Sequence, residues 1–356
     1  MMNFKEEAAK LEPYIIDTRR KLHMNPELSF EETQTTAFIA QELKKCGLDP
    51  HTYPDYNGVW TVIEGTKAFF GKRRTVALRA DIDALPVEEC TGLPFSSKNP
   101  GVMHACGHDN HTAMLLGAAR ILNAHREELC GNVKLIFQSA EESCRGAAYY
   151  VEHGFLDDVD AIFGMHVWAT LEDGKIDAAA GARMASVDNF SIKVRGISAH
   201  GSAPFEGRDA ITAAAAIIMN VQMIVSRFND PRNSLVITIG EITGGQRFNI
   251  IAGEVEMKGT VRTHSSVTRM QVEGWLRSMV ENTAAACGVE AELTYEYCAG
   301  PCTNDPTLSD IAKKAISEIA GPDVLVDQPP AMGSEDFAYY TDGTGVPGMY
   351  VFSWNI

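Results

Sequence analysis

One run of nine residues carries most of the side chains in this sequence that could bind a metal. The run from Met103 to His111 reads M-H-A-C-G-H-D-N-H and contains one thiol, three imidazoles and a carboxylate. These are the groups that proteins use to hold divalent metals. Cys106 and His108 are close enough to share one ion or to bind two neighbouring ions. The run therefore favours a metal site, with a polar helix start and incidental histidines as the alternative.

A pair of adjacent carboxylates forms the second chemical signal. Glu141 and Glu142 follow the apolar run Val133–Phe137. Adjacent side chains at a strand end point in different directions, so one can bind a metal while its neighbour acts as a general base. A solvated acidic turn is the structural alternative. The position directly after an apolar run favours the hydrolytic interpretation.

Other polar side chains also follow apolar runs. Asp81 and Asp83 come after Val76–Leu78, and His166 ends a later run. Two Asp residues spaced in this way lie on one side of an extended segment, and an Asp beside metal ligands commonly orients one of them. An Asx-type turn before Pro86 and a core histidine are the alternatives. Because each cluster ends an apolar run, we expect a site at the carboxyl ends of sheet strands.

The apolar runs alternate with stretches of helical spacing. Helices are expected up to Pro26 and over Thr36–Leu43, the second introduced by a capping box of Ser29 and Glu32. Strands are expected at 59–63, 76–78, 133–137 and 161–165, and helices near 112–124 and 144–152. This alternation predicts an α/β domain whose sheet is covered by helices on both faces.

The pattern changes near residue 185. Strands are expected at 187–194, 235–242, 254–262 and 290–297, with helices over 207–228 and 267–286. This β-α-β-β-α-β order is that of a ferredoxin-like α+β domain. The sequence therefore predicts an inserted domain, 185–298, within a discontinuous large domain formed by 1–184 and 299–356.

Four polar or turn positions outside the large clusters are weaker candidates. His200 lies in the loop Ser198–Ser202, and Asn249 and Arg262 lie at ends of expected strands. Each of these three is equally compatible with ordinary surface. Gly333–Phe337 is expected to begin a helix with Ser334 as its N-cap.

Composition limits the partners and the compartment. The 356 residues include 31 Lys and Arg against 47 Asp and Glu, a net charge of −16 that repels nucleic acid and anionic membranes. Residues 1–10 hold no apolar signal core, and the most apolar window, 213–225, is expected to be too short and interrupted to span a bilayer. Eight cysteines without a CxxC pair favour reduced thiols in the cytoplasm.

Taken together, the motifs resemble the M20 metallopeptidases, and more narrowly their amidohydrolase branch of hippurate hydrolases, indole-acetyl amino acid hydrolases and N-acyl amino acid deacylases. The resemblance runs in order through Arg19–Leu28, Arg79–Pro86, Met103–Asp109, Gln138–Glu142, Gly164–His166, Ser198–Ser202 and Gly333–Phe337. It implies a large di-metal catalytic domain with a mixed sheet, an inserted lid and dimerisation domain, and a homodimer. The implied reaction is metal-dependent hydrolysis of the amide bond of N-acyl or N-aroyl amino acids.

The resemblance also implies a role for each candidate. Two divalent ions, zinc or manganese, would be held by Cys106, His108, Glu142 and His166. Glu141 would be the general base, and Asp81, in preference to Asp83, would orient a ligand. In the inserted domain His200 would stabilise the oxyanion, often in the neighbouring subunit's site. The substrate would also be held by Asn249, Arg262 and Gly333.

The sequence departs from the family pattern at two places. Ser139 stands where the family usually has Pro, a mild change in a turn. The family also supplies a last histidine ligand after the strand expected at 347–352, whereas no histidine follows His264 in this sequence. We therefore expect the natural chain to continue beyond Ile356. A dipeptidase or carboxypeptidase on the same core, or a metal-depleted binding protein, are the alternative functions.

Overall fold

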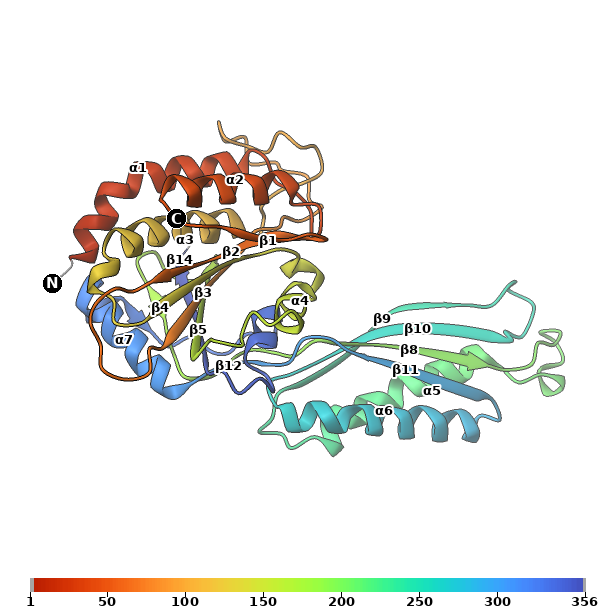
Figure 1. The fold of residues 1–356 in the computed structure, drawn as a ribbon. Helices are drawn as coiled ribbons and strands as arrows, with labels where there is room; N and C mark the ends of the chain where they lie inside the picture. Colours follow the sequence, from red (N-terminus) through yellow and green to blue (C-terminus); the bar gives the residue numbers. More distant parts are fainter. Residues whose placement is uncertain (1–2, 355–356) are drawn as a thin grey trace. The chain divides into compact units, whose positions relative to one another are not determined.

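The computed structural model describes residues 3–354 and consists of two compact units. Unit 1 comprises Met1–Arg183, Thr303–Pro329 and Asp336–Ile356, and unit 2 comprises Met184–Cys302 and Pro330–Glu335. Each unit has its own sheet with helices packed against it (Figure 1). β7 (Gly181–Met184) and β12 (Cys302–Asn304) form a separate two-stranded sheet.

The sheet of unit 1 has eight strands and is mixed. In spatial order they are β1 (His51–Tyr53), β2 (Tyr56–Glu64), β4 (Asn132–Gln138), β3 (Thr75–Asp81), β5 (Ala161–Trp168), β14 (Gly348–Trp354), β6 (Ile176–Asp177) and β13 (Leu325–Val326). The four central strands β4, β3, β5 and β14 are parallel. Their carboxyl ends therefore meet at one edge, as the apolar runs predicted.

Helices pack on this sheet because successive side chains of a strand face opposite sides. α1 (Phe4–His23), α2 (Thr33–Lys45) and α3 (His108–Ala124) lie together on one side of it (Figure 1). α4 (Gly146–Glu152) and α7 (Pro306–Ala320) complete the helices of unit 1. In β5, Phe163 packs in the apolar cluster beneath α7, whereas Gly164 faces Phe337 and Tyr350. Both faces of this strand are therefore covered.

Two predicted helix starts are wrong. Ser29 and Glu32 make no capping box, because the Ser29 hydroxyl donates to Asp83 and Glu32 binds the backbone of Ala140. The carboxylate of Glu27 instead accepts from the first turn of α2 at 2.8 and 3.1 Å. No helix is capped by Ser334 in the described part of the chain; a 3₁₀ helix, η6 (Asp336–Tyr340), follows it.

Short 3₁₀ turns connect several elements of the two units. They are η1 (Arg126–Glu128), η2 (Glu141–Ser143), η3 (Pro204–Glu206) and η5 (Pro322–Val324). η2 matters most for the chemistry, because it directly follows β4 and carries the glutamate pair.

Unit 2 has the β-α-β-β-α-β order along the chain. Its strands are β8 (Asp188–Arg195), β9 (Leu235–Gly244), β10 (Glu254–Thr263) and β11 (Glu290–Tyr297), arranged antiparallel in the order β11-β8-β10-β9. α5 (Ala210–Met223) and α6 (Ser266–Ala286) pack together against this four-stranded sheet, and their buried side chains form a single apolar core with it.

The length of α5 corrects one expectation from the sequence. The helix continues as a π turn, η4 (Ile224–Phe228), so that Ala210–Phe228 forms 19 residues with mean hydropathy 1.5. By length and composition alone, this segment is long and apolar enough to cross a membrane. The prediction that the apolar window at 213–225 is too short was therefore wrong. One face of it nevertheless packs into the core of unit 2, including Ala214, Ile217 and Val221.

Candidate metal centre

Three segments of unit 1 bring the candidate ligands together at the carboxyl edge of the sheet. Cys106 lies in the loop before α3, and its Sγ atom is 3.3 Å from Nε2 of His166, near the end of β5. Nε2 or Nδ1 of His108, at the first position of α3, lies within 4.8 Å of both atoms. Gly107 precedes the helix in the left-handed region (φ 95°), a conformation that glycine adopts without strain.

The glutamate pair completes this cluster from η2, after β4. Nε2 of His108 lies 3.8 Å from Oε2 of Glu141 and 3.9 Å from Oε1 of Glu142. Nε2 of His108 and Oε1 of Glu142 are both buried and lack a hydrogen-bond partner in the described structure. A buried polar atom without a partner destabilises a folded protein. A cation bound between these two atoms would give both of them a partner.

The electrostatics of the cluster also suit a cation. Burial opposes a charge on His108, but the facing Asp81, the bond to Asp83 and the nearby Cys106 thiol outweigh it and raise the imidazole's pKa well above its usual range. Burial raises the pKa values of the Cys106 thiol and of Glu142. Each of these groups would bind a metal in its deprotonated form. A divalent cation would therefore replace a proton here, and the donor set fits one.

His166 is already in the metal-binding form. Burial lowers its pKa to about 3, so the imidazole is neutral at physiological pH. Its Nδ1 atom lies 2.5 Å from the carbonyl oxygen of Val167, which leaves Nε2 directed at Cys106. A neutral imidazole that donates through one nitrogen and presents the other is the usual arrangement of a histidine ligand.

Asp83 and Asp81 hold different histidines. Nδ1 of His108 lies 3.1 Å from Oδ1 of Asp83, and Oδ2 of Asp83 accepts from the backbone N–H of Glu142 at 2.9 Å. Asp81 instead contacts Nδ1 of His111 at 2.5 Å and lies 3.8 Å from Nε2 of His108. The aspartate in hydrogen-bond contact with the candidate ligand His108 is therefore Asp83, whereas Asp81 is hydrogen-bonded to His111.

Glu141 is buried and is held by a hydrogen-bond network that was not predicted from the sequence. Its Oε1 atom accepts from the backbone N–H of Asp336 at 3.4 Å. The Arg79 guanidinium, fully buried, bonds to Asp81 at 2.5 Å and to Asp336 at 2.7 Å, and Gln138 also donates to Asp336. Arg79 stands two residues before Asp81 on the same face of β3, a spacing that could have revealed it.

The remaining residues of the 103–111 run have supporting positions. The buried carboxylate of Asp109 lies 2.8 Å from both Arg19 and His23. Nδ1 of His111 is hydrogen-bonded to Asp81, and its Nε2 accepts a hydrogen bond from the backbone N–H of Val167. His104 is buried with neither ring nitrogen bonded in the described structure, and burial lowers its pKa to about 4.

The substrate-binding candidates lie in unit 2. His200 is exposed, and its Nδ1 atom lies 2.7 Å from the Ser202 hydroxyl. The Gly201 N–H donates to the carbonyl of Asn249, so that these two loops are neighbours. Arg262 donates to the Ser334 hydroxyl at 3.1 Å, next to Gly333. Within unit 2 the loop of His200 therefore lies beside the loop of Asn249, and Arg262 contacts Ser334, the residue after Gly333.

Comparison with known proteins identifies the family. Residues 77–355 match peptidase family M20/M25/M40. The chain belongs to this family. This M20 chain is 39% identical over 357 residues to the N-acetyl-L-cysteine deacetylase of Bacillus subtilis, with 99% of this chain and 84% of the relative covered. It is 41% identical over 291 residues to the N-acyl-L-amino acid amidohydrolase of Geobacillus stearothermophilus, covering 82% and 78%.

A solved structure also resembles the M20 chain closely. The Bacillus subtilis YXEP protein, described as a dinuclear metal-binding peptidase of the M20 family, matches with a TM-score of 0.85 and 37% identity. The match covers 97% of this chain and 89% of that protein. The mixed α/β fold with a large mixed sheet is therefore confirmed.

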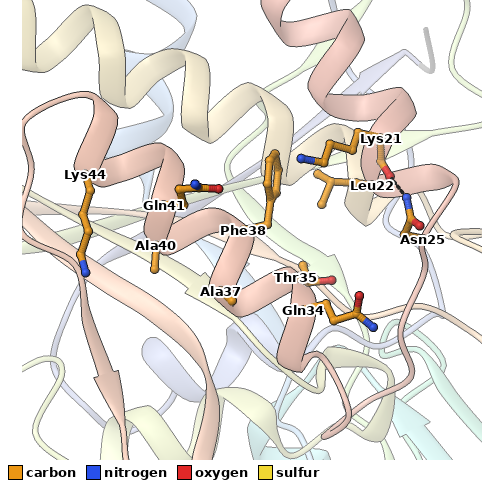
Figure 2. Close-up of a pocket in the computed structure, with 10 residues that line it drawn as sticks. All are labelled: Lys21, Leu22, Asn25, Gln34, Thr35, Ala37, Phe38, Ala40, Gln41 and Lys44. Atoms are coloured by element: carbon orange, nitrogen blue, oxygen red, sulfur yellow. Dashed lines mark hydrogen bonds between the residues drawn. The ribbon is translucent and has the colours of Figure 1, made fainter.

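A wide surface groove of the M20 chain lies away from these residues. It measures about 810 Å³ and is lined by residues of α1, α2 and the segment after α1 (Figure 2). The Lys21 ammonium lies 3.9 Å from the centre of the Phe38 ring, and Asn25 donates to the Lys21 carbonyl. None of the predicted site residues lines this groove, so we do not assign the chemistry to it.

Proposed function

We propose that this M20 chain is a metal-dependent amidohydrolase that cleaves N-acyl amino acids into a carboxylic acid and an amino acid. The convergence of Cys106, His108, Glu142 and His166 beside Glu141 is the observation that carries the proposal. The names of the relatives, a deacetylase and an amidohydrolase of N-acyl amino acids, support the linear amide as the bond that is cleaved. N-aroyl amino acids belong to the same proposed substrate class.

Two divalent ions, zinc or manganese, would be held by Cys106, His108, Glu142 and His166, with the thiolate favouring zinc slightly. Bound ions supply Lewis acidity that polarises the substrate carbonyl. Asp83 keeps His108 oriented through Nδ1 and fixes the backbone at Glu142, so it would position two ligands at once. We propose Asp81 as a second positioning residue, acting through His111.

Glu141 is the proposed general base. Its carboxylate takes one proton from the attacking water, whose oxygen forms a bond to the carbonyl carbon. The C–N bond then breaks, and the same carboxyl group returns a proton to the departing amine nitrogen. The bond from the Asp336 N–H holds Oε1, and Oε2 faces His108. A fixed carboxylate keeps this proton acceptor within the cluster.

We propose that unit 2 is the lid and forms a homodimer. His200 would stabilise the oxyanion, in the site of the neighbouring subunit, and its bond to Ser202 orients the imidazole. Asn249, Arg262 and Gly333 would bind the carbonyl and carboxylate of the substrate. Exposed apolar side chains along α5, including Met219 and Met223, support a partner on this unit. A monomer by sedimentation at micromolar concentration would contradict the dimer.

We also propose a cytoplasmic enzyme without nucleic-acid or membrane partners. All eight cysteines lie in the described residues and are free thiols, as a reducing compartment allows. The net charge of −16 disfavours both nucleic acid and anionic lipid. Fractionation of cells that express the natural protein would test this.

The direct test combines metal analysis with a substrate panel. Protein loaded with zinc or manganese should hydrolyse N-acetyl and N-benzoyl amino acids faster than dipeptides. Glu141→Gln should reduce kcat by at least about 10²-fold while the bound metal stays the same. Glu152→Gln, on an exposed position of α4, is the matched control. Inactivity of the metal-loaded protein on every amide would exclude the proposed function, and faster turnover of dipeptides would indicate a dipeptidase.

A further inference from the structure

A second cavity in unit 1 opens beside the candidate metal cluster. It has a volume of about 240 Å³, and Cys106 forms part of its wall. The residues at its mouth are exposed: Thr91, Leu93, Ala105 and Ala169. Because Sγ of Cys106 lies 3.3 Å from Nε2 of His166, the wall of this cavity includes one member of the candidate metal cluster, where the proposed function would place the carbonyl of the substrate.

The floor of the cavity is buried and carries an unused polar group. Gly107, Asn110 and Val167 are buried there, together with His104, which is 4% exposed. Neither ring nitrogen of His104 has a hydrogen-bond partner within the described residues. A buried polar side chain without a partner is rare in a folded protein and calls for an explanation. A neutral imidazole offers one donor and one acceptor to whatever enters.

The charged residues of the cavity already have counter-ions. The Arg19 guanidinium lies 2.8 Å from Asp109, and His23 lies between Asp109 and Glu89 at 2.8 and 3.4 Å. No cation in this wall is therefore without an anion, among the described residues, to receive the carboxylate of an amino acid. The cavity suits an uncharged group with apolar surface, and the acyl half of the substrate is such a group.

The size agrees with a ring rather than with a whole substrate. A cavity of roughly 150 Å³ is sufficient for a benzene-sized ligand, whereas pockets for complete ligands usually reach about 300 Å³ or more. At about 240 Å³ the cavity holds an aromatic ring with a substituent.

We propose that this cavity is the acyl-binding subsite, that it receives aroyl and other bulky uncharged acyl groups, and that His104 hydrogen-bonds to a hydroxyl on the bound ring. This inference rests on the proposed amidohydrolase function and names the residues that would select the acyl group among the N-acyl and N-aroyl substrates of that function. Leu93 and Ala169 at the mouth set the width, and His104 at the floor sets the preference for a polar substituent.

The first test narrows the mouth. Ala169→Phe should lower kcat/KM for N-benzoyl substrates at least about tenfold more than it lowers kcat/KM for N-acetyl substrates of the same amino acid. Ala68→Phe, at an exposed position that does not line the cavity, is the matched control and should change neither. Equal losses on both substrates, or no loss on either, would overturn the proposal.

The second test removes the polar floor. His104→Phe keeps a buried ring but has no donor or acceptor. The ratio of kcat/KM for N-(hydroxybenzoyl) over N-benzoyl substrates should fall about tenfold for the better of the 3- and 4-hydroxy isomers. An unchanged ratio for both isomers, with N-benzoyl turnover retained, would show that His104 does not contact the acyl group.

A binding measurement separates this inference from the proposed function. Equilibrium dialysis with labelled benzamide, an uncharged aroyl compound, requires no turnover. The parent protein should bind benzamide, and Ala169→Phe should weaken that binding about tenfold, whereas Ala68→Phe should not. If the parent hydrolyses no N-acyl amino acid but benzamide behaves in this way, the function fails and the cavity assignment stands. Equal benzamide binding by the parent and Ala169→Phe would overturn the cavity assignment in either case.

Discussion

Sγ of Cys106 and Nε2 of His166 lie 3.3 Å apart, although 60 residues separate them in the sequence. The thiol comes from the loop before α3, and the imidazole from the end of β5. They meet because β3 and β5 are parallel neighbours, so the segments that leave their carboxyl ends lie on the same edge of the sheet. In this pair a soft metal-binding atom, the Cys106 sulfur, faces a borderline one, the His166 nitrogen.

We predict that Cys106→Ser lowers the affinity for zinc by at least about tenfold, because a hydroxyl is a much poorer zinc ligand than a thiolate. Competition with a fluorescent chelator measures this change. Cys90→Ser is the control, since Cys90 is exposed. Equal zinc affinity of the parent and Cys106→Ser would remove Cys106 from the ligand set.

Asp83→Asn should weaken metal binding by about 10- to 100-fold, as the loss of a residue that orients a ligand usually does. The amide removes the charge that faces Nδ1 of His108, and can no longer accept equally from both His108 and the Glu142 N–H. Calorimetric titration with zinc gives the affinity. Asp173→Asn, an exposed position in the same unit, should bind as the parent does. If Asp83→Asn bound zinc as tightly as the parent does, Asp83 would not orient a metal ligand.

Arg79→Met should lower the free energy of unfolding by about 3–5 kcal/mol, because it leaves two buried carboxylates without their cation. The carboxylates are those of Asp81 and Asp336, and both are fully buried. Urea denaturation measures the loss. The matched variant Arg232→Met breaks an ion pair on an exposed side chain and should cost less than about 1 kcal/mol. Similar costs for the two variants would contradict the role given to Arg79.

The stability conferred by His23 should depend on pH. The bond to Asp109 raises the pKa of His23, so its contribution is complete below the unfolded value of about 6.5 and is lost as the pH rises through the folded value. His23→Gln should therefore cost about 1.5–3 kcal/mol near pH 5.5 and less at higher pH. Denaturation of metal-free protein across this range gives the two costs, with His51→Gln, a more exposed histidine, as control. A cost that stayed constant with pH would mean that the charge of His23 does not contribute.

The sequence by itself determined the chemical groups and the edge of the sheet on which they meet. Glu141, Glu142 and His166 all follow or end apolar runs, and strand periodicity with the parallel arrangement places such positions at the carboxyl ends. The order of elements in unit 2 could also be read from the sequence, since period-two and helical spacing are local properties of the chain.

Only the tertiary structure decided which partner each of these groups contacts. Asp81 and Asp83 are equivalent in the sequence, yet Asp83 contacts His108 and Asp81 contacts His111. The bond from Arg79 to Asp336 joins residues 257 positions apart. A local sequence pattern determines which helix or strand a residue belongs to and on which face of it the residue lies. The contacts of that residue depend on the side chains that other segments pack against it. This is also why the unpartnered His104 at the cavity floor could not be recognised from the metal-binding run alone.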